Sequence, residues 1–194
     1  MTIFNEICKR VLNSTNRIPK ILIGLFLSFL FFLPFAYGYL YRYAQQIKQS
    51  KDFELPDWTD WKGLLIDGFR FLAISIPFFI LPVLVGWLIS VLLSWLFGLI
   101  NLPFSFPLFA SALFILSIPT TISALIHFQE KEDFRSLLQL KVILTRALSS
   151  WKEWSLFLLA FFGLFIATKP LYPASLFFGF LILMPYLITV FSKE

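Results

Sequence analysis

Glu54-Leu-Pro-Asp-Trp-Thr-Asp-Trp-Lys-Gly-Leu-Leu-Ile-Asp-Gly68 is a short polar segment between two apolar runs that are long enough to cross a membrane. No charged residue occurs in Ile21–Tyr41 before it or in Phe71–Ile126 after it. Two further uncharged runs cover Trp154–Thr168 and Pro170–Ser192. Because a helix needs about 20 apolar residues to cross a ~30 Å hydrocarbon core, these runs predict about five membrane-spanning helices, with four and six as alternatives.

The composition indicates the same class of protein. Of the 194 residues, 59% are hydrophobic and 14% are charged, whereas soluble domains carry about 25% charged residues. The net charge of +5 suits basic loops beside anionic lipid. No basic patch is large enough for a nucleic-acid groove, so nucleic acid is not an expected partner. We therefore predict an all-α, polytopic helical membrane protein with a single domain over residues 1–194.

The segment Leu64–Ile100 is too long for one upright helix at 1.5 Å per residue. Pro77 and Pro82 would kink such a helix, so the sequence favours one long bent helix, with a tight hairpin as the alternative. The predicted spans are residues 21–43, 67–99, 105–128, 154–169 and 173–191.

Two amphipathic segments are predicted to lie along the membrane surface, over residues 1–19 and 129–152. The apolar face of the first contains Ile3, Phe4, Ile7, Val11 and Leu12. The apolar face of the second contains Leu137, Leu140, Leu144, Leu148 and Trp151.

A few polar and aromatic residues are candidates for binding. Asp67 and Arg70 are three residues apart, so they share a helix face, either as a structural ion pair or as a functional one. His127 is the only histidine and is predicted to lie at the membrane interface. Asp57, Trp58 and Trp61 belong to the polar segment, where a solvated loop explains them as well as a binding site does.

The sequence lacks the usual patterns of catalysis. The single cysteine, Cys8, and the single histidine provide no metal-ligand spacing. There is no Gly-rich phosphate loop and no plausible Ser/His/Asp arrangement. We therefore expect no catalytic residues, no metal and no cofactor, which argues against an enzyme.

Several short patterns together resemble the Domain of Unknown Function 4013 family. They are Lys20-Ile-Leu-Ile-Gly24, the Pro34…Gly38-Tyr39…Arg42 end of the first predicted span, Leu55-Pro56-Asp57-Trp58, and Leu65-Ile-Asp67-Gly68-Phe69. The resemblance implies a multi-pass protein of the prokaryotic cytoplasmic membrane, and it implies no activity. The family-motif residues are Gly38, Tyr39, Leu55, Pro56, Asp57, Trp58, Asp67 and Gly68.

With the resemblance in view, three motif residues have expected physical roles. Gly38 permits close approach of a second helix, and Pro56 favours an extended chain before the next helix. Gly68 lets another backbone approach the start of that helix.

These observations favour a non-enzymatic scaffold or accessory subunit that binds membrane lipid, another membrane protein or a second copy. The alternative is a small transporter or channel, as a monomer or a dimer. Asp67 and Arg70 would then lie near the permeation or substrate path. A weak repeat supports it, because Trp58-Thr-Asp-Trp61 is echoed by Trp151-Lys-Glu-Trp154. A lipid-modifying enzyme would need a cleft lined by Asp57, Asp60, Asp67 and His127.

Overall fold

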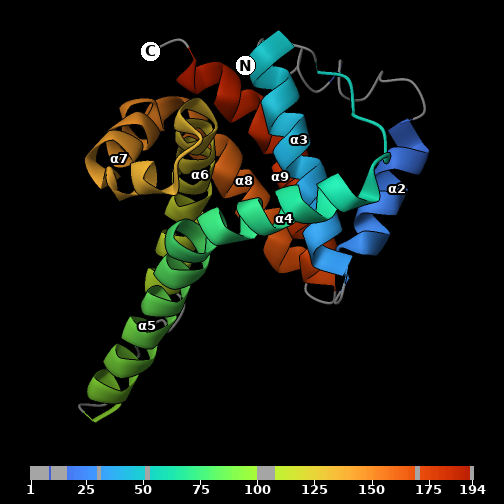
Figure 1. Cartoon of the computed structure of the whole chain (residues 1–194). Coiled ribbons are helices and arrows are strands. Elements are labelled where there is room, and N and C mark those ends of the chain that lie inside the picture. The colour runs from blue at the N-terminus through green and yellow to red at the C-terminus, as the bar shows by residue number, and fades with distance from the viewer. Residues whose placement is uncertain are drawn as a thin grey trace.

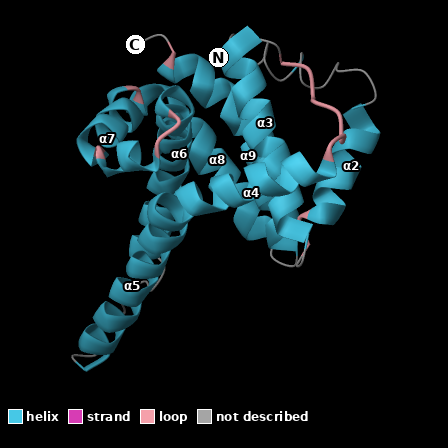
Figure 2. Ribbon diagram, viewed as in Figure 1, coloured by secondary structure: helices cyan, strands magenta, loops and turns pink. Residues whose placement is uncertain are grey.

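The structure, a computed structural model, describes residues 9, 17–29, 32–50, 53–99, 108–168 and 171–192. Within these residues every regular element is a helix and there is no strand (Figure 2). The protein is therefore an all-α, polytopic helical membrane protein, as predicted. The elements are α2 (Arg17–Leu27), α3 (Leu33–Ser50), α4 (Trp61–Ser75), π-helix η2 (Ile76–Ile80), α5 (Leu81–Leu99), α6 (Leu108–Lys131), 3-10 helix η3 (Phe134–Leu138), α7 (Leu140–Ser149), α8 (Trp151–Ala167) and α9 (Tyr172–Phe191).

Three helices among the described residues are long and apolar enough to cross a membrane: Trp61–Leu96, Ser111–Lys131 and Tyr172–Phe191. The helices α7 and α8 meet at a bend of 82° and add a fourth span only if the pair counts as one. The count is thus below the predicted five. The predicted span 154–169 overlaps α8, which has 17 residues, begins at Trp151 and ends at Ala167.

The predicted first span, residues 21–43, consists of two helices, so the expectation of one helix was wrong. The helix α2 ends at Leu27, and the Ser28 hydroxyl donates to the Gly24 carbonyl at 2.7 Å. The helix α3 begins at Leu33-Pro34 and runs on to Ser50. Proline favours the first turn of a helix and disfavours helical geometry in the residue before it. Pro34 therefore begins a new helix where the predicted span continues an old one.

The segment from Trp61 to Leu99 is one continuous helical run that bends at η2, which confirms the long bent helix and rules out the hairpin. In Figure 1, α4 crosses in front of α3, and α5 then points away from the rest of the molecule. Pro82 has no N–H to give to the Phe78 carbonyl four residues earlier. The Thr120 hydroxyl of α6 lies within hydrogen-bonding distance of that carbonyl, at 3.3 Å, and 3.0 Å from the Leu116 and Ser117 carbonyls of its own helix.

The helices α5 and α6 form a projecting arm (Figure 1). Gly86, Ser90 and Ser94 recur every fourth residue of α5, and the first two are buried. Such small residues let membrane helices pack closely. The other faces of α5 are exposed. In the most apolar stretch of Trp61–Leu96 only 17% of the residues are buried, against 72% and 67% in the other two spans.

The core lies where α3, α6 and α9 meet. Its largest fully buried side chains include Tyr39 and Tyr43 of α3, Ile122 and Leu125 of α6, and Phe177 of α9. The helix α9 contacts α2, α3, α6 and α8. The last helix of the chain therefore holds together helices from both halves of the sequence.

The predicted surface segment 1–19 lies outside the described residues, except for residue 9 and residues 17–19. In the other predicted surface segment, 129–152, α7 buries Ile143 and Ala147 against the rest of the protein. Of the residues predicted on the apolar face of this segment, Leu137 is also buried. The other residues expected on that face are exposed: Leu140, Leu144, Leu148 and Trp151.

Candidate functional site

The helices α3 and α4 touch backbone to backbone where they cross. A Cβ atom built on Gly38 would overlap the Leu64 carbonyl oxygen of α4. Conversely, a Cβ on Gly68 would overlap the Pro34 carbonyl oxygen of α3. Only a glycine leaves room for such an approach. The roles expected for Gly38 and Gly68 are confirmed, and each glycine serves the same crossing.

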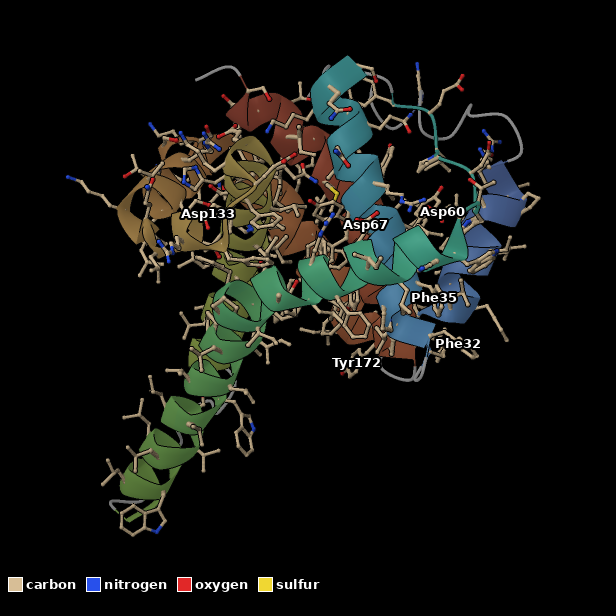
Figure 3. All side chains as sticks on the ribbon, viewed as in Figure 1. Phe32, Phe35, Asp60, Asp67, Asp133 and Tyr172 are labelled. Carbon is tan, nitrogen blue, oxygen red and sulfur yellow. The ribbon has the colours of Figure 1, made fainter. Side chains whose placement is uncertain are left out.

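A charged network, which we call the crossing network, lies beside this contact and consists of Arg42, Asp60, Asp67 and Arg70. Arg42 of α3 donates through Nε to Asp67 Oδ2 at 2.8 Å and through Nη2 to Asp60 Oδ2 at 2.9 Å. Arg70 Nη1 lies 3.1 Å from the other Asp67 oxygen, Oδ1. Figure 3 labels Asp60 and Asp67 where α4 passes α3. The Asp67 carboxylate is 15% exposed, and both of its oxygens are bound.

Asp60 also begins α4. Its backbone has φ of 52°, in the left-handed region, which Asp tolerates better than most residues. Its Oδ1 accepts from the Gly63 N–H at 3.2 Å, as an N-cap. The Arg42 guanidinium, followed by the Gly63 N–H, lowers the pKa of the Asp60 carboxyl. One aspartate thus joins the start of α4 to α3.

Residues 53–60, which we call the strap, run from α3 to α4 by way of α2. Lys20 of α2 donates to the Leu55 carbonyl at 2.6 Å and pairs with Asp57 at 2.8 Å. Trp58 Nε1 donates back to the Lys20 carbonyl at 2.9 Å. The Trp58 ring stacks on Tyr39, with centroids 4.2 Å apart. Leu55 itself is 2% exposed. The strap therefore fixes α2 against α3.

Residues 21–185 match the family described as protein of unknown function (DUF4013). The chain belongs to the DUF4013 family. No curated protein and no solved structure matches it. In this DUF4013 chain the family-motif residues meet at one corner of the fold: Gly38 and Gly68 at the crossing, Asp67 in the crossing network, and Leu55, Asp57, Trp58 and Tyr39 around the strap.

The candidate residues Asp57, Trp58 and Trp61 lie together at this corner. Trp61 stacks beside Trp58 at 6.0 Å and meets Phe35 edge-on at 5.7 Å. Trp61 is 48% exposed, as an interfacial tryptophan would be. Asp57, however, is paired with Lys20, so the corner holds its acidic groups in ion pairs.

His127 belongs to a second group, the α6-end cluster, made of Lys48, His127, Glu130, Gln139 and Arg146. Glu130 lies 3.2 Å from Arg146 Nη2, 3.7 Å from Lys48 Nζ and 3.8 Å from His127 Nδ1. His127 Nε2 lies 3.2 Å from the Gln139 side-chain oxygen. Burial is the main cause that lowers the Lys48 pKa, and the nearby Glu130 opposes it. The cluster joins the ends of α3 and α6 to α7.

Sequence reasoning assigned no role to Lys20, Arg42, Lys48, Glu130 or Arg146, although each makes an ion pair between elements. Lys20 and Arg42 were already part of the patterns that resemble the family, and this was the one signal pointing to them. The other three lie in polar stretches whose charges look solvated. No group of three or more His, Cys, Asp or Glu residues in the described chain is arranged to hold a metal ion.

Proposed function

We propose that this DUF4013 protein is a non-enzymatic membrane scaffold or accessory subunit that binds another membrane protein, or a second copy, through α5. The observation that carries the proposal is the exposure of the long helix. Its most apolar stretch is 17% buried, whereas the other two spans are 72% and 67% buried. A helix packed on one neighbour leaves most of its surface to lipid or to a partner.

The outer face of α5 supports a protein contact. Leu84, Trp87, Leu88 and Trp95 are 49%, 51%, 57% and 63% exposed. Large rigid aromatic side chains are enriched where proteins bind each other. The small residues of α5 already face α6, so the partner would meet this aromatic and leucine face.

The crossing network supports binding in preference to transport. Asp67 has both oxygens bound by arginines from two helices. Releasing such a pair to bind a solute would leave an uncompensated charge in a partly buried place. Asp67 and Arg70 therefore fit a structural role better than a place in a permeation path.

Site-specific photo-crosslinking in cells tests the proposal. A photoreactive amino acid replaces Leu88 of α5 in one variant and Leu159 of α8 in the control, since these are 57% and 58% exposed. We expect a protein adduct of one defined mass at Leu88 and only lipid adducts at Leu159. The same lipid adducts at both positions would contradict the proposal. Fractionation of the same cells tests the location proposed from the family resemblance, the cytoplasmic membrane of a prokaryote.

The second candidate function is a small transporter or channel. It is favoured by the π-helical turn η2 within the long helix, because such turns often lie at functional sites. Ion flux into proteoliposomes, measured for the wild type and for Asp67→Asn, tests it. Flux that is present in the wild type and lost in a folded Asp67→Asn variant would support transport. Vesicles that contain the wild-type protein and show no ion flux would argue against it.

A further inference from the structure

A cavity lies between the bend in the long helix, α6 and α7. Its volume is about 200 Å³. The lining residues are Pro77, Phe78, Pro82, Leu113, Leu116, Ser117, Thr120, Leu140 and Leu144. The cavity thus joins the bend in the long helix to the exposed leucine face of α7.

The chemistry of the lining selects an apolar occupant. The only polar side chains among the lining residues are Ser117 and Thr120. The Ser117 hydroxyl donates to the Phe114 carbonyl at 2.7 Å, and the Thr120 hydroxyl is within reach of three carbonyls, among them Phe78. A bound water needs two to four polar partners, roughly speaking, and these hydroxyls are already engaged. A polar solute would gain little here.

The size of the cavity further limits which occupant it can hold. Pockets that enclose a drug-sized ligand measure about 300–1,000 Å³, which is more than this cavity offers. A partner helix, ~10 Å across, would not enter it. A single flexible hydrocarbon chain fits both the size and the lining.

A positive charge stands next to the mouth of the cavity. Lys141 comes three residues before Leu144, so the two side chains are neighbours on the surface of α7. Lys141 is exposed and forms no ion pair with any described residue. On its other flank, Lys141, Thr145 and Arg146 line an open hollow that is more polar than the cavity. The helix α7 contains no acidic residue.

We propose that the cavity binds one acyl chain of an anionic phospholipid from the surrounding bilayer, and that Lys141 holds its phosphate. Leu140 and Leu144 guide the chain across α7 into the space beside Pro77 and Pro82. This site differs from the outer face of α5. The inference rests on the membrane setting in the proposed function and not on a partner of α5.

Native mass spectrometry of the full chain tests the proposal. The protein is taken from nanodiscs of equal parts phosphatidylglycerol and phosphatidylcholine into a mild detergent, and the retained lipid is identified by mass. We expect the wild type to retain one phosphatidylglycerol. Leu144→Trp fills the cavity mouth and should lose the bound lipid. Lys141→Gln should retain lipid, with the preference for phosphatidylglycerol lowered roughly fivefold.

Two matched variants serve as controls. Leu148→Trp changes an exposed leucine one turn further along α7, outside the cavity lining, and Lys152→Gln removes an exposed charge from α8. Equal retention by Leu144→Trp and Leu148→Trp, or a fatty-acid adduct in place of phospholipid, would overturn the proposal. Circular dichroism of Leu144→Trp separates a filled cavity from a misfolded chain. If the crosslinking experiment at Leu88 found no protein partner for α5, the lipid binding expected here would be unaffected.

Discussion

Two glycines set the distance between α3 and α4, and each faces the carbonyl of a residue on the opposite helix. Gly38 meets Leu64, and Gly68 meets Pro34. A carbonyl oxygen of a helix backbone is fixed in place, whereas a side chain can change its rotamer to relieve an overlap. Any residue larger than glycine therefore forces the helices apart, which also moves Arg42 away from Asp67.

We expect Gly38→Ala and Gly68→Ala each to lower the free energy of unfolding by roughly 1–3 kcal/mol, the usual cost of overpacking. Gly163→Ala is the matched control, because a Cβ there meets nothing within 4 Å. Alanine favours a helix over glycine, so the control should gain about 0.5–1 kcal/mol. Thermal unfolding in detergent measures all three. A stable Gly38→Ala would mean that the crossing is looser than the structure has it.

For individual residues, the sequence predicts contacts within a helix and misses contacts between helices. The Asp67–Arg70 pair follows from a spacing of three residues and is confirmed at 3.1 Å. Arg42 lies 25 residues from Asp67 in the chain, and no helical spacing links them. Only the path of the strap, which turns the chain back across α3, brings the two together.

Among the elements, the bent helix shows how one helix completes the hydrogen bonds of another. Pro82 leaves the Phe78 carbonyl without its α-helical donor, and the Thr120 hydroxyl of α6 lies 3.3 Å from it, within hydrogen-bonding distance. Thr120 follows Pro119, a proline within α6 itself. The bend is therefore a property of the α5–α6 pair rather than of the long helix alone.

We expect Thr120→Val to lower the free energy of unfolding by about 0.6–2 kcal/mol, the range for hydrogen bonds between membrane helices. Thr121→Val is the control, because the Thr121 hydroxyl donates only to Ser117 of its own helix, at 2.6 Å. In a Pro82→Ala background residue 82 regains its N–H, so Thr120→Val should cost less. A double-mutant cycle measures this coupling. Equal costs in both backgrounds would show that Phe78 does not need Thr120.

The proline positions predicted the bend in the long helix but not the boundary between α2 and α3. Pro77 and Pro82 were expected to bend the long helix, and they do so. Pro34 was placed inside a span over residues 21–43, yet it begins α3. Hydropathy averages over many residues and cannot separate a kinked helix from two helices. Contacts between distant segments, such as those that Lys20 of α2 makes with Leu55 and Asp57 of the strap, lie outside what hydropathy reads.

Across the whole molecule, charged residues gather in the crossing network and in the α6-end cluster. Each joins α3 to another part of the chain. In the α6-end cluster Lys48 is the group whose pKa is lowered by burial. Its ordinary pKa is 10.5. Between the lowered pKa and 10.5 the unfolded chain binds more protons, so stability rises with pH across this window.

Replacing Lys48 removes this dependence. We expect the melting temperature of the wild type, relative to that of Lys48→Met, to rise as the pH increases towards 10.5, the ordinary pKa of the lysine ammonium group. Lys152→Met, which changes an exposed lysine of α8, should follow the wild type. Parallel melting curves for the wild type and Lys48→Met would contradict the expectation.

The sequence predicts the class of the whole molecule better than its number of spans. Composition and uncharged runs are sufficient for an all-α membrane protein. The number of spans depends on where helices break and how they tilt, as in the 82° bend between α7 and α8. These features come from contacts between distant segments, which uncharged runs do not record.

The contact between the first described helix and the last has a consequence for biosynthesis. Gly24 of α2 faces the ring of Phe177 in α9, and Tyr39 of α3 lies 6.3 Å from the same ring. Chains are made from the N-terminus and fold as they emerge. The helices α2 and α3 are therefore made long before α9, and the face that Phe177 covers stays uncovered until α9 is synthesised. A chain that stalls before Tyr172 therefore presents that uncovered face to the quality-control proteases of the membrane.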